Sequence, residues 1–349
     1  MLFFNPLDLD LSTNHLNGSI PSELGLISGM NSLNLSYNHL SGSIPSEIGL
    51  LYTLEFLFLS NNHLSRTIPS EVGILSRLYT LDLSTNHLSG GMPSQVGLLS
   101  NLNQLDLSTN NLSGSIPSEL GLLSTLGLTT DWNHGQKPGW NYFIRILDLS
   151  CNDLSGAIPS EVWTLHLLST LDLSINHLSG TMPSEVGILS RLSTLGLSTN
   201  HLSGSIPTEL GKLTELEATL NLTSNIFTGT VPMELGMMSN IQRLDLSNNR
   251  LAESMLHLSN STSLNHLNLS HNELTSFPFS QVWTNLEVLD LNENQINQEI
   301  SVDLDGLSFI KDLLLSNNYF YGTIPNKIRS LVRLERLHID NNILFGTIP

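Results

Sequence analysis

The chain has few charged side chains, and basic side chains are the scarcest. Charged residues make up 13% of the 349 residues, about half the usual share. The 13 Lys and Arg stand against 31 Asp and Glu, which gives a formal net charge of −18. A nucleic-acid-binding protein needs basic side chains to neutralise phosphates, and anionic membranes attract basic segments. The composition therefore argues against both as partners.

The sequence also lacks cysteine pairs and long apolar runs. Its one cysteine, Cys151, excludes an internal disulfide and a zinc site built from several cysteines. No stretch approaches the roughly 18 apolar residues of a membrane-spanning helix, so we expect no membrane segment. The start, MLFFNPLDLD, has no basic region and no small-residue cleavage site, and so predicts no signal peptide. We therefore expect either an intracellular protein or a piece of a longer chain.

One repeat accounts for most of the sequence. The stretch LDLSTNHLSG at 81–90 returns as LDLSINHLSG at 171–180, and GSIPSELGLIS at 18–28 returns at 114–124 with one change. Indexed by the Asn that follows an L-x-L step, the chain has 14 repeats, and nine of the 13 intervals are 24 residues. The index residues are Asn14, Asn38, Asn62, Asn86, Asn110, Asn152, Asn176, Asn200, Asn225, Asn249, Asn272, Asn294, Asn318 and Asn342.

Each part of the repeat has a physical role. The L-x-L step alternates like a strand with one buried face. The Asn amide can bond to backbone groups that the turn leaves unpaired, and the Gly permits a tight bend. Pro followed by Ser and Glu, as at Pro21-Ser22-Glu23, suits the start of a short helical segment, after which the leucines return to the core. No single repeat can bury its own leucines, so stacking must stabilise the chain.

These residues resemble the leucine-rich repeat family in its plant-type 24-residue class, with the signature L-S-G-x-I-P. The resemblance implies an α/β repeat solenoid: a leucine-rich-repeat horseshoe or superhelix with an inner parallel β-sheet and convex 3-10 or short helical segments. We expect one such domain over 1–349, with about 14 repeats, an irregular insertion near 127–144 and atypical repeats near 250–301. Eleven repeats carry the signature's [I/M/V]-P step, at Pro21, Pro45, Pro69, Pro93, Pro117, Pro159, Pro183, Pro207, Pro232, Pro325 and Pro349.

The resemblance also implies a function. Known members are typically extracellular or cell-surface recognition modules, so we expect a receptor-like, non-enzymatic protein that binds a protein or peptide on its concave face. Two alternatives remain: an inhibitor of a secreted cell-wall-degrading enzyme, and a structural protein whose repeats associate end to end. The sequence has no G-x-S-x-G, P-loop or H-E-x-x-H motif and no Cys/His pair with a plausible partner. We therefore expect no catalytic residues and no cofactor.

An acidic column is the first candidate binding feature. Asp82, Asp106, Asp148 and Asp172 stand four residues before the index Asn in four successive repeats. Carboxylates so close together are expected to raise one another's pKa or to attract cations or a basic partner. The functional interpretation is an acidic docking strip for a basic protein or a sugar-rich ligand. The alternative is that LDLS is a duplicated consensus and each Asp is simply solvated.

The long interval between Asn110 and Asn152 supplies the second candidate. It spans 42 residues and contains TTDWNHGQKPGWNYF at 129–143. Aromatic side chains among a few polar groups are typical of binding anchors, which points to Trp132, Trp140 and Tyr142. The alternative interpretation is a degenerate cap or repeat.

A column of histidines follows the index Asn. His15, His39, His63 and His87 are consecutive copies. Neighbouring imidazoles can share a zinc ion, but this column lies on an exposed turn and has no flanking cysteine. Duplication of one ancestral residue explains it, so we expect no metal site.

Overall fold

The structure is a computed structural model that describes residues 7–124, 143–254, 258, 263–279, 283, 285–300 and 304–349. The chain divides into two compact units, Met1–Leu178 and Ser179–Pro349, which we call the first and the second unit.

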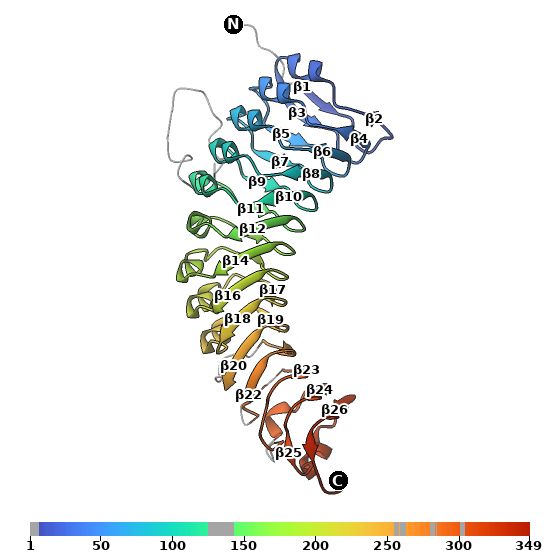
Figure 1. Cartoon of the computed structure of the whole chain (residues 1–349), viewed down its shortest axis with the longest axis vertical. Coiled ribbons are helices and arrows are strands. Elements are labelled where there is room, and N and C mark those ends of the chain that lie inside the picture. The colour runs from blue at the N-terminus through green and yellow to red at the C-terminus, as the bar shows by residue number, and fades with distance from the viewer. Residues whose placement is uncertain are drawn as a thin grey trace. The chain divides into compact units, whose positions relative to one another are not determined.

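Every repeat of the first unit contributes a short strand to a parallel sheet, the main sheet (Figure 1). Neighbouring strands pair in register, so equivalent residues of successive repeats, such as Leu81 and Leu105, lie side by side. The main-sheet strands are β1 (Leu7–Asp10), β3 (Met30–Asn34), β5 (Phe56–Phe58), β7 (Thr80–Asp82), β9 (Gln104–Asp106), β11 (Ile146–Asp148) and β13 (Thr170–Asp172). Their L-x-L leucines form the core, and both Leu81 and Leu105 are fully buried.

A second parallel sheet, which the sequence analysis did not predict, follows the index Asn. Its strands in the first unit are β2 (Asn17–Gly18), β4 (His39–Gly42), β6 (His63–Arg66), β8 (His87–Gly90), β10 (Asn111–Gly114) and β12 (Asp153–Ala157). The glycine of L-S-G bends the chain at the end of a strand, for example Gly90 at φ +75°. This backbone conformation favours glycine because a Cβ atom would clash there.

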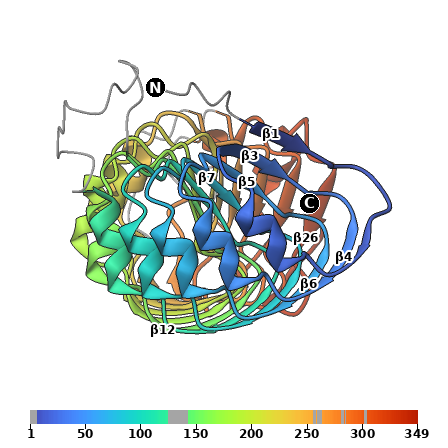
Figure 2. The ribbon, with the colours of Figure 1, turned by 90° about the horizontal axis from the view of Figure 1, so that it is seen from above.

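A 3-10 turn then follows the proline of each repeat, as the sequence predicted. These turns are η1 (Ser22–Leu26), η2 (Ser46–Leu50), η3 (Ser70–Ile74), η4 (Ser94–Leu98), η5 (Ser118–Ser124) and η8 (Ser160–Thr164). Figure 2 shows the turns of the first unit as one row, coloured from blue to green. The expectation that the following leucines return to the core holds for Leu51 and Leu99, which are buried, but not for Leu50 and Leu98, which are exposed.

The second unit repeats this arrangement. Its main-sheet strands are β15 (Thr194–Gly196), β17 (Ala218–Asn221), β19 (Ile241–Asp245), β21 (His266–Asn268), β23 (Val288–Asp290), β24 (Asp312–Leu314) and β26 (Arg336–His338). The second sheet comprises β14 (His177–Thr181), β16 (His201–Ser205), β18 (Ile226–Gly229), β20 (Arg250–Ser254) and β22 (Glu273–Ser276), while β25 (Tyr321–Gly322) pairs with β27 (Ile343–Leu344). The 3-10 turns are η9 (Ser184–Ile188), η10 (Thr208–Lys212), η11 (Met233–Met237), η12 (Asp305–Leu307) and η13 (Asn326–Ser330).

Aromatic side chains fill the core of the second unit where the I-P step is missing. The Phe277 ring centroid lies 5.0 Å from that of Phe279 and 5.8 Å from that of Trp283. All three side chains are buried.

The index asparagines join each repeat to its neighbours. The Asn86 side-chain nitrogen donates to the Leu59 carbonyl of the preceding repeat at 3.0 Å, and also to two carbonyls of its own turn. Its side-chain oxygen accepts the Leu64 backbone N–H at 2.9 Å. Asn62 and Asn110 make the same set of bonds. The predicted role of the asparagine amide is therefore confirmed.

The residue before each index Asn adopts a left-handed backbone conformation, for example Ile175 at φ +55°. A β-branched residue is strained in this region, whereas asparagine tolerates it. Asparagine already occupies the equivalent position at Asn61 and Asn248.

We expect Ile175→Asn to raise the free energy of unfolding by about 1 kcal/mol, because it relieves this strain. The Ile175 side chain is 50% exposed, so little packing is lost. Urea unfolding followed by circular dichroism measures the change, and the reverse variant Asn61→Ile should lower the midpoint. Equal midpoints for both variants and the wild type would contradict the strain.

Candidate functional site

The four predicted aspartates lie on adjacent strands of the first unit. Asp82 pairs in register with Asp106, Asp106 with Asp148, and Asp148 with Asp172. The leucines on either side of each Asp are buried in the core. Because side chains alternate along a strand, the carboxylates project from the opposite face of the main sheet, which we call the strand face.

Each aspartate also closes the end of its own strand. One carboxylate oxygen of Asp106 accepts the backbone N–H of Ser108 at 3.0 Å and the Ser108 hydroxyl at 2.7 Å. Asp82, Asp148 and Asp172 make the same two bonds to the serine two residues later. The second oxygen of each of the four has no hydrogen-bond or ion-pair partner among the described residues.

This capping does not require a charge. Asn34 accepts the backbone N–H and the hydroxyl of Ser36 at 3.1 and 2.7 Å, and Asn268 does the same for Ser270. An Asp→Asn change at these positions therefore removes the charge while keeping the cap.

Partial burial raises the pKa of Asp106 and of Asp148 above the usual value for a carboxyl group, and the serine hydrogen bonds oppose this rise. The neighbouring carboxylates raise the pKa of both further, but less than burial does. No Lys or Arg of the described residues forms an ion pair with the four aspartates. Among the described residues, the column is thus a partly buried negative surface that no Lys or Arg pairs with.

An aromatic patch adjoins the acidic column. The Phe56 ring stacks on that of Phe58 with centroids 6.4 Å apart, and it meets the Tyr79 ring edge-on at 6.0 Å. All three residues are half-buried, and Phe58 pairs in register with Asp82. The sequence analysis did not single out this patch, although Phe56 and Phe58 stand at outward strand positions that are mostly polar in the other repeats. We call the patch and the four aspartates together the strand-face site.

The aromatic candidates of the insertion, Trp132, Trp140 and Tyr142, lie outside the described residues, so their role stays a prediction. The structure resumes at Phe143, whose carbonyl accepts a bond from the Asn103 side chain at 3.0 Å. The ring of Phe143 lies 6.4 Å from that of His166. The last part of the 127–144 region is thereby joined to the repeats of the first unit.

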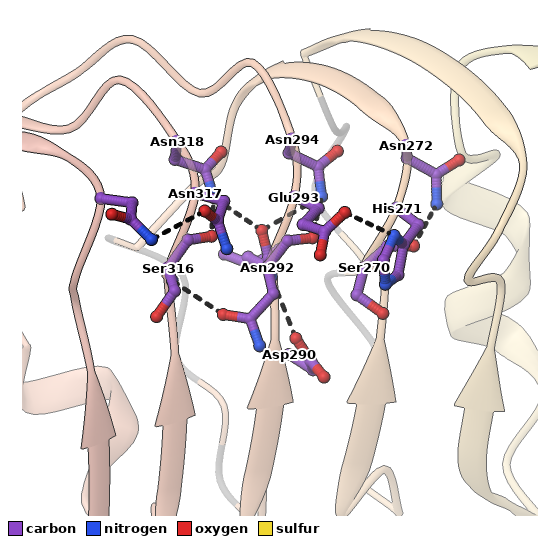
Figure 3. A network of polar contacts seen from close by, with 12 residues as sticks. Ser270, His271, Asn272, Asp290, Asn292, Glu293, Asn294, Ser316, Asn317 and Asn318 are labelled. Atoms are coloured by element: carbon purple, nitrogen blue, oxygen red, sulfur yellow. Dashed lines mark hydrogen bonds and ion pairs between the residues drawn. The ribbon is translucent and has the colours of Figure 1, made fainter.

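Some acidic groups of the second unit, in contrast, form pairs with Arg, Lys or His. Two nitrogens of Arg336 donate to both carboxylate oxygens of Asp312 at 2.6 and 2.5 Å, and this holds the pKa of Asp312 below its usual value. Lys311 pairs with Glu287 at 2.8 Å. Figure 3 shows a further contact, from His271 to Glu293, at 2.9 Å.

Hydrogen bonds between neighbouring repeats also stabilise strand ends in the second unit. Leu314 stands where most repeats have Asp or Asn, so Ser316 has no cap from its own strand. Instead, Asn292 of the preceding repeat accepts the Ser316 backbone N–H at 2.7 Å (Figure 3), and Asp340 of the following repeat accepts the Ser316 hydroxyl. These polar groups of the second unit are therefore used within the fold.

The histidine column forms a regular stack. Ring centroids of His15, His39, His63 and His87 follow one another at 5.7, 5.9 and 5.8 Å, and the rings are nearly parallel and exposed. Within the described ranges, no three His, Cys, Asp or Glu side chains are grouped as metal ligands would be. No described helix has the length and apolar character needed to cross a membrane.

The sequence matches the family model described as Leucine Rich Repeat. The match covers residues 30–51, 53–75, 77–99, 101–123, 143–165, 191–213, 263–283 and 285–307. Together these segments make up more than half of the chain.

Curated relatives come from Arabidopsis thaliana. Receptor-like protein 9a is 35% identical over 65 residues, which is 18% of this chain and 7% of that protein. Pollen receptor-like kinase 2 is 33% identical over 99 residues, which is 28% of this chain and 15% of the kinase. These matches therefore span only a small part of the relatives' length.

Solved structures match nearly the whole chain. The plant peptide hormone receptor RGFR1, in complex with RGF2, has a TM-score of 0.78 at 32% identity, covering 97% of this chain and 55% of that one. The Arabidopsis receptor kinase HAESA, in complex with the peptide hormone IDA and the co-receptor SERK1, has a TM-score of 0.80 at 32% identity, covering 98% and 55%. A leucine-rich repeat protein of Leptospira interrogans has a TM-score of 0.62 at 28% identity, covering 97% and 91%. This chain spans about half the length of the two receptor chains.

Proposed function

Because the chain belongs to the leucine-rich repeat family, we propose that it is a non-enzymatic, receptor-like module that binds a peptide or protein through the strand-face site of its first unit. Its relatives include receptor-like proteins, and similar structures include receptors in complex with peptide hormones. The observation that carries the proposal is the column of Asp82, Asp106, Asp148 and Asp172, which no described Lys or Arg pairs with, beside the aromatic patch.

The charge of the site favours a basic ligand. A partly desolvated carboxylate attracts a cation more strongly than a fully solvated carboxylate does, because the effective dielectric constant around it is lower. The net charge of −18 also attracts basic molecules over a longer range. Half-buried aromatic rings provide an anchor for an apolar or aromatic side chain of the same ligand.

The spacing of the column sets the ligand's pattern. Neighbouring strands of a parallel sheet lie about 4.8 Å apart, so alternate aspartates are separated by about 9.6 Å. An extended peptide in the polyproline II conformation advances about 3.1 Å per residue and has three residues per turn, so its side chains at i and i+3 lie on the same face about 9.3 Å apart. A peptide that crosses the strands can therefore place basic side chains at positions i and i+3 on alternate aspartates, with an apolar residue at its end on the Phe56 and Phe58 side.

We expect the double variant Asp106→Asn/Asp148→Asn to weaken binding of such a peptide at least about tenfold, because it removes the two central charges of the column. The probe is a fluorescein-labelled extended peptide with one aromatic residue and Lys at every third position. Fluorescence anisotropy with the full chain measures its Kd at low and at high salt. A peptide with Glu in place of Lys should not bind.

Asp245→Asn is the matched control, because Asp245 caps Ser247 in the same way but lies in the second unit. It should leave the Kd unchanged. If the Lys peptide binds no better than the Glu peptide, or if both Asn variants bind equally well, the site assignment is wrong.

The pKa shifts give a check on folding. Burial raises the pKa of Asp106 and Asp148 in the folded chain, so their ionisation opposes folding as the pH rises through that pKa. The double Asn variant should therefore be at least as stable as the wild type at pH 7, and this advantage should vanish below about pH 3.9. A loss of peptide binding with this stability profile cannot come from unfolding.

A further inference from the structure

The 3-10 turns of the first unit expose a large apolar side chain at the same position in five consecutive repeats. Leu26 is 72% exposed, Leu50 54%, Ile74 62%, Leu98 52% and Leu122 39%. We call these five residues the turn stripe. It lies on the row of turns in Figure 2 and includes no residue of the strand-face site.

The fold does not require an apolar side chain at this position. Thr164 occupies it in η8 and Lys212 occupies it in η10, and both turns keep the 3-10 conformation. A leucine or isoleucine there gains little from burial in the chain itself. Contiguous exposed apolar surface on a soluble protein marks an interaction site more often than isolated apolar residues do.

A row of acidic side chains borders the turn stripe. Glu23, Glu47, Glu71 and Glu119 each stand three residues before a stripe residue, and Gln95 takes the same place before Leu98. In a 3-10 helix the side chains at i and i+3 eclipse one another, so each glutamate lies on the same face of the turn as the stripe residue.

We propose that the turn stripe is a second interaction surface, which binds an amphipathic basic α-helix of a partner protein. The turns repeat with the strands, about 4.8 Å apart, and one turn of an α-helix advances about 5.4 Å. Apolar residues at i, i+3 or i+4, and i+7 of such a helix therefore meet successive stripe residues. Five repeats accommodate a helix of about 16 residues.

The glutamates beside the turn stripe favour a basic helix over a second copy of the chain as the partner. Two stripes facing each other would bring two rows of glutamates together, and each chain carries a net charge of −18. Lysine or arginine residues flanking the apolar face of a helix would instead meet Glu47 and Glu71. The partner is thus defined by an apolar helical face with basic borders.

The test uses a fluorescein-labelled synthetic helix of about 18 residues, with Leu at i, i+3, i+4 and i+7 and Lys on both borders. Fluorescence anisotropy with the full chain gives its Kd. We expect Leu50→Asn/Ile74→Asn to weaken binding about tenfold or more, because it removes the centre of the apolar surface. Glu47→Gln/Glu71→Gln should weaken it about threefold and reduce its dependence on salt. Leu50 and Ile74 are exposed and Glu47 and Glu71 are half-buried, so the urea midpoint should change little.

Two controls separate this surface from the strand-face site. Ile188→Asn alters an exposed residue at the equivalent position of η9 in the second unit and should leave the Kd unchanged. Asp106→Asn/Asp148→Asn should also leave helix binding unchanged, so failure of either proposal does not affect the other.

The proposal is overturned if the helix binds no better than a scrambled peptide of the same composition, or if Leu50→Asn/Ile74→Asn binds it as tightly as the wild type. It is also overturned if sedimentation equilibrium shows a dimer of the wild type that Leu50→Asn/Ile74→Asn dissociates, because a second copy then covers the stripe.

Discussion

Asn86→Ala should lower the free energy of unfolding by roughly 2 to 4 kcal/mol, although it deletes only a small polar side chain. The Asn86 side chain is 5% exposed and connects two neighbouring repeats. Without it, the buried Leu64 N–H loses its partner. The three carbonyls that accept from Asn86 each lose one donor but keep another, from Asn61, Asn62 or Asn110. A buried backbone group without a partner costs about 1–3 kcal/mol. Urea unfolding followed by circular dichroism measures the loss.

Asn111→Ala is the control for this prediction. Asn111 is exposed on β10 in the next repeat, so its removal should change the free energy of unfolding by less than about 0.5 kcal/mol. A similar small effect for Asn86→Ala would mean that water or a backbone shift replaces the asparagine bonds, and the column would then not hold the repeats together.

The parts of the fold that depend on the repeat period were predictable from the sequence. The L-x-L spacing places Leu81 and Leu83 on one face of a strand whichever neighbour the strand pairs with, and both are fully buried. The asparagine column was predictable for the same reason, because a side chain that bonds the turn in one repeat does so in every copy. The second sheet was not predictable, because strands such as Asn17–Gly18 are too short to show an alternating pattern.

The candidate site was predictable only in part. In-register pairing brings Asp82, Asp106, Asp148 and Asp172 together, as the column in the sequence suggested. Two other features of the site depend on three-dimensional packing. Each aspartate also caps a serine, and burial raises the pKa of Asp106 more than the neighbouring charges do. The proposed contribution of the site to binding stays a prediction.

The outward direction of the turn stripe was also not predictable from the sequence, because it depends on the geometry of the 3-10 turns. In the sequence, the pair Leu98-Leu99 looks like two core residues that follow a helical segment. The 3-10 geometry sends Leu98 outward and Leu99 inward, so that only one of the two is buried. Two surfaces of different chemistry thus arise from one repeat, the strand face from the L-x-L segment and the turn stripe from the 3-10 segment.

The glycines of the 3-10 turns lie very close to the backbone of the turn in the next repeat. A Cβ atom on Gly97 in η4 would lie 2.1 Å from the Glu119 backbone oxygen in η5 and 2.6 Å from the adjoining carbon. Gly25, Gly49 and Gly73 meet the next turn with similar closeness. A methyl group at Gly97 cannot be accommodated by rotating a flexible side chain, because the atoms it meets belong to the backbone.

We therefore expect Gly97→Ala to lower the free energy of unfolding by about 3 kcal/mol, the upper end of the usual cost of overpacking. Gly91→Ala is the matched control, because its nearest neighbour would be the Ser113 backbone oxygen at 3.8 Å, an ordinary contact. Its effect should stay within about 1 kcal/mol, since alanine also restricts the unfolded chain. Equal urea midpoints for the two variants would show that the turns are not in contact at Gly97. A large difference would place the stripe residues on a rigid row of touching turns, which is the arrangement that binding along several repeats requires.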